Sequence, residues 1–404
     1  ASGNDSFTYK VNDGYVDSAT STISLGLRTD PLYKYQWHLH NDGGNYFSSF
    51  NGVAGQDLNV DSVIAAGNDG TGKVTIVDSG LQKNHPDLRQ QQVSGYNVLD
   101  GSTDPTSTDT DGDHGTFVAG IVGATGWNDI GGRGVAPGVE LFGYNLIAQS
   151  TPSREINALG QHSVVADTDI FNMSYGVTPT QISPQIDSTL HAALVDGVTN
   201  LRGGKGAIYV ASSGNDYDIG GSSTNDDYTY CGYWPNSGTY KIGCKDAGFD
   251  TRLTVPEIIA VGALAADGKK ASYSTPGSSI WVVAPGGERG NDTSFTGSGS
   301  PSGPAILSTD QTTCSKGYMS PEKPSFRLSS FNDYSNPSTD NSTCDYALGT
   351  AGTSWAAPMV SGVVALMLEA NGDLTWRDVK HVLASTAVKA DQSFSATPIG
   401  GVDY

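Results

Sequence analysis

The spacing of hydrophobic and polar positions divides the chain into two parts. Near the N-terminus, apolar residues from Phe7 to Val11 alternate with polar ones, and a turn at 12–14 leads to a second strand-like stretch over 20–25. This alternation predicts a β-hairpin extension within residues 1–26. An isolated hairpin is barely stable, so we expect it either to dock on the rest of the chain or to belong to an upstream β-domain.

From about residue 57 the pattern changes to short apolar runs that alternate with helical periodicity. Continuous apolar strands between helices indicate an α/β fold with a mostly parallel central sheet and helices on both faces, which gives three layers. We expect residues 27–404 to form one large domain. The predicted strands include 73–77, 207–210 and 258–261, and the predicted helices are 116–122, 187–198, 356–370 and 376–385.

Glycine and proline change this picture in one region. The chain of 404 residues holds 52 glycines and 18 prolines, which is typical of a protein rich in tight turns. Residues 286–351 are long, polar and rich in Gly, Ser and Pro. Because a structureless loop of that length is rare inside a compact domain, we predict an ordered surface excursion.

The four cysteines predict disulfides rather than a metal site. None forms a C-x-x-C pair, which argues against zinc or thioredoxin-like chemistry. Pairing between sequence neighbours would staple the 286–351 excursion, but three pairings are open. Disulfides favour an oxidising compartment, so we expect a secreted protein. The residues are Cys231, Cys244, Cys314 and Cys344.

The charge of the chain excludes some partners. With 42 acidic and 22 basic residues, the formal net charge is −20. A nucleic acid or an anionic membrane requires a basic face, so we expect neither as a partner. No run of 18 apolar residues occurs that could span a bilayer.

Three separated segments carry residues of nucleophilic catalysis. Asp78 ends the strand at 73–77, His114 enters a helix of small residues, and Ser354 follows a Gly-Thr turn before an apolar helix. A serine hydroxyl is a weak nucleophile that needs a base, and the base needs an orienting carboxylate. Each residue alone has an ordinary structural interpretation as a cap or turn. Together, in the order Asp, His, Ser, they predict a catalytic triad.

A fourth segment supplies a candidate oxyanion donor. A buried strand over 207–210 runs into small residues that end at Asn215. Acyl transfer builds negative charge on the carbonyl oxygen, and a side-chain amide together with a backbone N–H can stabilise it. The Ser354 N–H at the start of its helix would be the second donor. The alternative for Asn215 is an ordinary turn residue.

With these motifs the chain resembles the subtilisin-like serine proteases over most of its length, from about Asp30 to Ala387. The kexin/furin-type branch and its secreted bacterial relatives are the most similar, through Asp30-Pro31-Leu32, Asp57-Leu58-Asn59-Val60, His85-Pro86-Asp87-Leu88 and Leu374-Thr375-Trp376-Arg377. The resemblance implies a three-layer subtilisin-like domain, with Asp78, His114 and Ser354 as the triad and Asn215 at the oxyanion. It further implies a substrate edge at Ser174, Tyr175 and Gly176, a pocket wall at Ala211, Ser212, Ser213 and Gly214, and an acid near the site at Asp111.

The resemblance also implies calcium. In this family the loop over 125–132 binds Ca²⁺, with carbonyls expected from Thr125, Ile130 and Gly132, a side chain from Asn128, and carboxylates from Asp57 and Asp87. Oxygen donors of this kind suit Ca²⁺. A second acidic run at Asp100, Asp104 and Asp109 is a weaker candidate, because such runs are usually solvated.

The chain departs from the kexin/furin pattern where that branch reads basic substrates. Ser79 stands where a second Asp follows the catalytic one, 177–181 contains no acid, and Asn157 lies where a helical acid is expected. Asp216, Asp226 and Asp227 could supply charge in another geometry.

The leading hypothesis is therefore a secreted, calcium-stabilised serine endopeptidase, made as a zymogen and acting as a monomer. Its expected partners are protein or peptide substrates and a propeptide or inhibitor. Within the enzyme class, the alternative is a processing protease selective for Lys or Arg sites. Outside it, the alternative is an inactive binding or adhesion protein with a protease fold.

Overall fold

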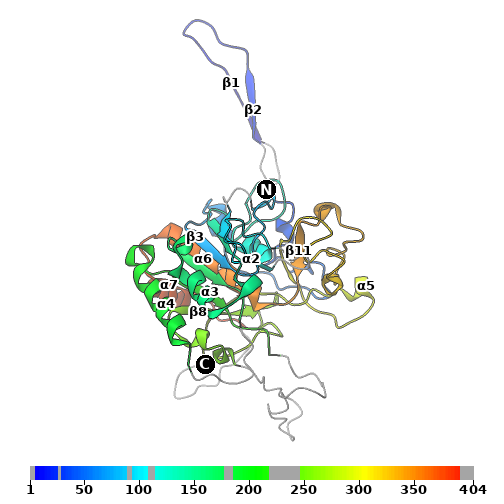
Figure 1. The fold of residues 1–404 in the computed structure, drawn as a ribbon. Coiled ribbons are helices and arrows are strands. Elements are labelled where there is room, and N and C mark those ends of the chain that lie inside the picture. Colours follow the sequence, from blue (N-terminus) through cyan, green and yellow to red (C-terminus); the bar gives the residue numbers. More distant parts are fainter. Residues whose placement is uncertain are drawn as a thin grey trace.

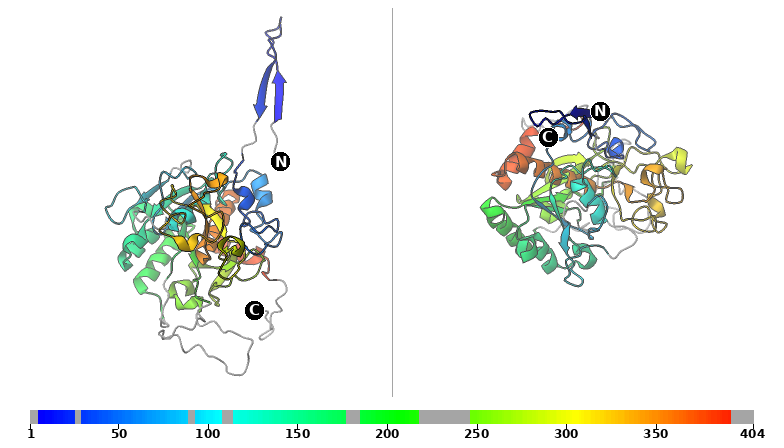
Figure 2. Two further views of the ribbon diagram at one scale, coloured as in Figure 1. Left: turned by 90° about the vertical axis from the view of Figure 1, so that its right-hand side faces the viewer. Right: turned by 90° about the horizontal axis from the view of Figure 1, so that it is seen from above.

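A computed structural model describes residues 5–25, 29–88, 93–107, 114–176, 185–217 and 246–391 of the chain. At the N-terminal end, β1 (Asp5–Tyr9) and β2 (Ser21–Leu25) pair as an antiparallel hairpin. The hairpin stands away from the rest of the chain (Figures 1 and 2), and residues 8–22 are all exposed. The predicted hairpin therefore forms without docking on the body.

A seven-stranded parallel sheet forms the centre of the described chain, in the order β4-β5-β3-β6-β7-β8-β9. Its middle strands are continuous runs of buried residues, as expected for a sheet covered on both faces. The strands are β3 (Lys73–Val77), β4 (Ser94–Tyr96), β5 (Glu140–Tyr144), β6 (Ile170–Met173), β7 (Ile208–Ser212), β8 (Ile258–Leu264) and β9 (Ile280–Pro285).

The helices cover this sheet in the three-layer arrangement that the sequence predicts. Neighbouring residues of a strand point to opposite faces, and in β6 Asn172 accepts a hydrogen bond from Ser361 of α6 at 2.9 Å. Its neighbour Phe171 stacks on the ring of Tyr209. The Tyr209 hydroxyl in turn packs directly against Gly197 of α4, where an added Cβ would lie only 1.9 Å from it. Helices α6 and α4 therefore lie on opposite faces. The α-helices are α1 (Asp61–Ala65), α2 (His114–Gly123), α3 (Pro152–Ile156), α4 (Ser188–Asn200), α5 (Thr293–Thr296), α6 (Thr353–Ala370) and α7 (Trp376–Thr386).

Helix α6 is the central helix of the fold. It is long and apolar enough to cross a membrane by composition, but 67% of it is buried inside the body. It packs against α2 and against β6 to β9, which is the environment of a core helix. It begins at Thr353, three residues before the predicted start, so its first turn includes Ser354.

The 286–351 excursion is ordered, as predicted. Strands β10 (Ile306–Thr309) and β11 (Tyr346–Gly349) pair antiparallel within it. A separate apolar cluster lies beneath this hairpin and includes Leu307, Phe331 and Leu348. The disulfide between Cys314 and Cys344 closes the excursion, whereas Cys231 and Cys244 lie outside the described residues.

Candidate active site

Three parallel strands bring the candidate residues to one edge of the sheet. Val77 of β3 is level with Met173 of β6, and Met173 is level with Ala211 of β7. Asp78, Ser174 and Ser212 follow these positions at the carboxyl ends of their strands. That edge is where open α/β sheets form their sites.

Asp78 and His114 are in direct contact. The Nδ1 atom of His114 lies 2.8 Å and 3.0 Å from the two carboxylate oxygens of Asp78. Asp78 is fully buried, and its Oδ1 also accepts a hydrogen bond from the Ser79 amide at 2.7 Å. A buried, fixed carboxylate of this kind orients the imidazole and stabilises its protonated form.

The start of α2 holds His114 close to this strand. A Cβ at Gly115 would lie 1.8 Å from the carbonyl oxygen of Gly80, so the close approach of helix and strand requires glycine there. The Gly115 amide donates to Ser79 Oγ at 3.0 Å. The His114 ring packs on Trp355, with 4.9 Å between ring centroids, and Trp355 directly follows Ser354. The histidine therefore faces the first turn of α6.

Ser354 is hydrogen-bonded to the substrate-edge segment. Its Oγ donates to the Ser174 carbonyl at 3.0 Å, and Ser174 Oγ donates to the Ser354 carbonyl at 2.9 Å. Ser354 is 9% exposed and lies in the first turn of α6, where backbone N–H groups have no partner within the helix. The serine is thus near solvent and beside N–H groups that can bind an anion.

Asn215 lies beside the same turn. Its Oδ1 accepts hydrogen bonds from the amide and the hydroxyl of Thr353, at 2.8 Å and 2.9 Å. With Oδ1 occupied in this way, the Nδ2 group is the end of the amide left to donate. Sequence reasoning missed Thr353 as the residue that orients this amide.

A pocket opens next to these residues. It is lined by Ser212, Ser213 and Gly214 of the predicted wall, by Gly176 of the predicted substrate edge, and by Asp216, Asp246 and Asp250. Ala211 is buried within β7 and does not line the pocket, and Asp111 lies outside the described residues. The predicted wall thus faces a real pocket, with two carboxylates that sequence reasoning did not find.

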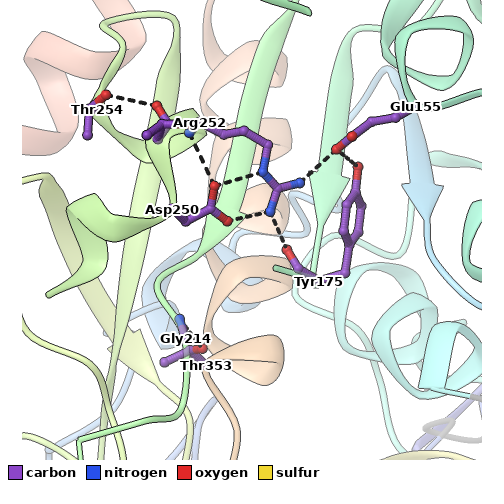
Figure 3. A network of polar contacts seen from close by, with 8 residues as sticks. Glu155, Tyr175, Gly214, Asp250, Arg252, Thr254 and Thr353 are labelled. Carbon is purple, nitrogen blue, oxygen red and sulfur yellow. Dashed lines mark hydrogen bonds and ion pairs between the residues drawn. The ribbon is translucent and has the colours of Figure 1, made fainter. Parts of the chain in front are cut away.

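Behind the pocket, Arg252 joins residues from three segments (Figure 3). Its guanidinium donates from Nε and Nη2 to the two oxygens of Asp250, at 2.9 Å and 2.5 Å, and from Nη1 to Glu155 Oε1 at 2.8 Å. Nη2 also donates to the Tyr175 carbonyl at 3.3 Å. Burial opposes the charge, but Asp250, Tyr175 and Glu155 together outweigh it and raise the pKa of Arg252 above its usual range.

The 125–132 loop brings Asp87 together with Asp30, a residue that sequence reasoning did not place there. Asp30 accepts hydrogen bonds from the amides of Trp127 and Asn128, at 2.8 Å and 3.0 Å. Asn128 Nδ2 donates to Asp87 Oδ1 at 2.7 Å. Burial raises the pKa of Asp30 to about 6 and that of Asp87 to about 8. Two buried carboxylates therefore lie at this loop.

Among the described residues, no hydrogen bond joins Asp57, the other predicted carboxylate, to this loop. Its two carboxylate oxygens accept hydrogen bonds from the amides of Asn41 and Asn59, at 2.9 Å and 2.8 Å. Asp57 therefore stabilises the chain around Asn41 and Asn59, and its part in a calcium site stays a prediction.

The residues around Asp30 and Asp87 suit a divalent cation. Among the described residues, the carbonyl oxygens of Thr125, Ile130 and Gly132 accept no hydrogen bond. A Cβ at Gly131 would lie 2.4 Å from Asp87 Oδ2, so only glycine leaves this space open. Carbonyls, carboxylates and an amide oxygen form the donor set that Ca²⁺ prefers.

The second acidic run gives no sign of a metal site in the described residues. Asp100 Oδ1 accepts from the Ser102 amide at 2.8 Å, and Asp104 Oδ1 accepts from the Thr106 amide at 3.0 Å. Both carboxylates stabilise turns, and the Ser102 amide lowers the pKa of Asp100. Asp109 lies outside the described residues.

Comparisons with known proteins identify the family of the chain. The profile of the subtilase family (Peptidase S8) matches residues 69–400. The Aeromonas extracellular serine protease of Aeromonas sobria is 35% identical over 372 residues, which are 90% of this chain and 55% of that protein. Neuroendocrine convertase 2 of Rattus norvegicus is 31% identical over 93% of this chain and 48% of its own length. The chain thus spans about half the length of these relatives.

A solved structure also matches. The crystal structure of the Aeromonas sobria serine protease in complex with the chaperone ORF2 has a TM-score of 0.78 and 31% sequence identity, and covers 91% of this chain and 59% of that one.

Proposed function

This chain belongs to the subtilase family, and on that premise we propose that it is a serine endopeptidase that hydrolyses peptide bonds through Asp78, His114 and Ser354. The observation that carries the proposal is the contact of buried Asp78 with His114 Nδ1 at 2.8 Å, beside the turn that bears Ser354. This arrangement supports the roles of Asp78 as the orienting acid, His114 as the base and Ser354 as the nucleophile.

In the proposed reaction, His114 takes the proton of Ser354 Oγ as that oxygen attacks the peptide carbonyl. Nδ2 of Asn215 and the Ser354 N–H stabilise the negative charge on the carbonyl oxygen. His114 then gives its proton to the leaving amine, and an acyl-enzyme remains on Ser354. Water, activated by His114, hydrolyses that ester and restores the serine.

The test uses a fluorophosphonate that labels activated serines, together with a chromogenic peptide. Wild-type protein should be labelled and should cleave the peptide, and Ser354→Ala should lose both, with kcat lower by at least about 10⁴-fold. A Ser354→Ala variant that keeps wild-type activity would exclude this serine as the nucleophile. A folded wild-type protein that is neither labelled nor active would favour an inactive binding protein instead.

A finer proposal is that the pocket prefers Lys or Arg before the scissile bond. It is supported by Asp216, Asp246 and Asp250, which line the pocket, because carboxylates attract a cationic side chain. Peptides with Arg, Lys, Phe or Leu at that position test it. A flat or aromatic-favouring profile would reject the preference.

We also propose a stabilising calcium ion held by Asp30, Asp87, the Asn128 side chain and the carbonyls of Thr125, Ile130 and Gly132. The support is the pair of buried carboxylates beside carbonyls that accept no hydrogen bond from the part of the chain that the structure describes. Bound calcium would supply positive charge that keeps both carboxylates ionised. These protein groups would fix the loop that follows α2, the helix bearing His114.

Secretion and a propeptide or inhibitor partner are further proposals. One relative is described as extracellular, and one matched structure contains a chaperone. Fractionation of the producing cells into medium and cell contents tests secretion, and recovery of the chain only from cells would reject it.

A further inference from the structure

A buried arginine lies between the candidate pocket and the candidate substrate edge. Arg252 is 8% exposed and does not line the pocket, whereas its partner Asp250 does. The guanidinium binds Asp250 through two parallel hydrogen bonds, the strongest geometry for an arginine and a carboxylate. The Asp250 carboxylate of the pocket is therefore paired with a cation that lies outside the pocket lining (Figure 3).

The same guanidinium holds the segment that bears the substrate edge. It donates to the Tyr175 carbonyl and lies 4.9 Å from the centre of the Tyr175 ring. The Tyr175 hydroxyl donates to Glu155 Oε1 at 3.0 Å, which is also bound by Arg252. The carbonyl of the preceding Ser174 is bound by Ser354 Oγ instead. The edge segment is thus held by the nucleophile at one residue and by Arg252 at the next.

The charges of this cluster do not cancel completely. Asp250 and Glu155 carry two negative charges and Arg252 one positive charge, all at positions with side chains no more than 19% exposed. Water screens such buried charges poorly, so each acts on the adjacent pocket. Removing the arginine would leave a net charge of −2, and removing the Asp250 charge would leave the cluster neutral.

We propose that Arg252 is a specificity-determining residue, which sets how strongly the pocket favours a cationic side chain by neutralising Asp250 while it positions the Tyr175 segment. The inference rests on the proposed peptidase function. In the wild type, Arg252 weakens the preference for Lys and Arg that the negative charge of Asp250 would otherwise give.

Four variants test this role, because they should raise, lower or preserve the preference for a cationic side chain. The measured quantity is the ratio of kcat/KM for a peptide with Arg before the scissile bond to kcat/KM for the matched peptide with Phe, in mildly alkaline buffer. Arg252→Gln should raise the ratio by about tenfold and Asp250→Asn should lower it by a similar factor. The double variant Asp250→Asn/Arg252→Gln, which restores the wild-type cluster charge, should return it close to the wild-type value. Arg252→Lys keeps the charge and should keep the ratio, while kcat/KM falls for both peptides because lysine cannot form the two-pronged contact.

Arg202 provides the matched control. Its side chain is 5% exposed, it pairs with Asp169 at 3.1 Å and it bonds backbone carbonyls, but it lies at the opposite edge of the sheet. Arg202→Gln should lower stability without changing the ratio. If Arg252→Gln and Asp250→Asn both leave the ratio unchanged in folded protein that a fluorophosphonate still labels, the inference is wrong and the peptidase function stands. If the wild type cleaves neither peptide, both are wrong.

Discussion

Thr353 contacts Asn215 twice, since its amide and its hydroxyl both donate to Asn215 Oδ1, at 2.8 Å and 2.9 Å. The same hydroxyl oxygen accepts a hydrogen bond from the Gly214 amide at 3.1 Å. The residue before the candidate nucleophile therefore fixes both the rotation of the Asn215 side chain and the turn that carries it. This preorganises a donor that would otherwise rotate freely in an exposed position.

Thr353→Val should therefore weaken catalysis without removing any member of the triad. Loss of the hydroxyl removes one of the two hydrogen bonds that hold Asn215 Oδ1, while the bond from the backbone amide remains. The resulting misalignment of one oxyanion donor should lower kcat by about tenfold, which is less than deletion of the donor costs. KM should change little, because the effect arises in the transition state. Thr353→Ser keeps the hydroxyl and is the control. A rise in KM at constant kcat would show that Thr353 acts on substrate binding instead.

Calcium titration can decide whether Asp30 or Asp57 joins Asp87 in the proposed calcium site. Asp30→Asn should abolish most of the rise in melting temperature that calcium produces, because Asp30 lies at the 125–132 loop. Asp57→Asn is the control and should respond to calcium as the wild type does. A ligand at 100 times its Kd stabilises the folded state by about 2.7 kcal/mol, an effect that thermal unfolding with and without a chelator detects. A normal calcium response in Asp30→Asn would remove Asp30 from the site.

His38 makes stability depend on pH in a predictable direction. It is fully buried, neither ring nitrogen has a hydrogen-bond partner among the described residues, and burial lowers its pKa from 6.5 to about 3. The unfolded chain therefore binds a proton between these values and the folded chain does not. The contribution of neutral His38 to the free energy of unfolding is fully present above pH 6.5. Below that pH it falls by up to about 1.4 kcal/mol for each pH unit.

The measurement is the free energy of unfolding in denaturant for wild type and His38→Leu as pH is lowered from 7 toward 4. The free energy of the variant should fall less steeply with pH, because the variant lacks the protonation of His38. His40 provides a control of opposite sign, because its hydrogen bond with Asp61 raises its pKa, so its stabilisation is lost as pH rises. Parallel slopes for wild type and His38→Leu would mean that water or a rearrangement solvates His38.

The elements that carry the chemistry could be predicted because their signals are local. The run at 73–77 forms β3 with the predicted bounds, and Asp78 follows it at the sheet edge. Helix α6 begins three residues before the sequence predicts, because Thr353 and Ser354 have turn-forming side chains although they occupy the first helical turn.

The contacts that the sequence did not reveal join distant segments. Asp30 and Asp57 both precede polar turns, and only the tertiary contact of Asp30 with the Trp127 and Asn128 amides distinguishes them. Arg252 meets Glu155 across 97 residues of chain. No periodicity or spacing indicates which of several acidic residues will share one arginine, so these partners required the structure.

The 286–351 excursion is hydrogen-bonded to α2, the helix that bears His114. From β10, Ser308 Oγ donates to the Phe117 carbonyl and Thr309 Oγ1 to the Thr116 carbonyl, each at 2.7 Å. The disulfide from Cys314 to Cys344 closes the chain between β10 and β11 over a separation of 30 residues. The strand pairing and the apolar cluster beneath it also hold this hairpin. The disulfide therefore acts mainly by restricting the unfolded chain.

The double variant Cys314→Ser/Cys344→Ser should accordingly lose stability and keep its activity. A closed loop of this length restricts the unfolded chain by about 3.5 kcal/mol, so the free energy of unfolding in denaturant should fall by about that amount. The turnover rate for each fluorophosphonate-titrated site should stay at the wild-type value, because the Ser308 and Thr309 contacts with α2 remain. The single variant Cys314→Ser would leave an unpaired thiol, which makes the double variant the cleaner comparison. A large fall in turnover for each active site would contradict this account, because it would mean that the disulfide orders α2 within the folded protein.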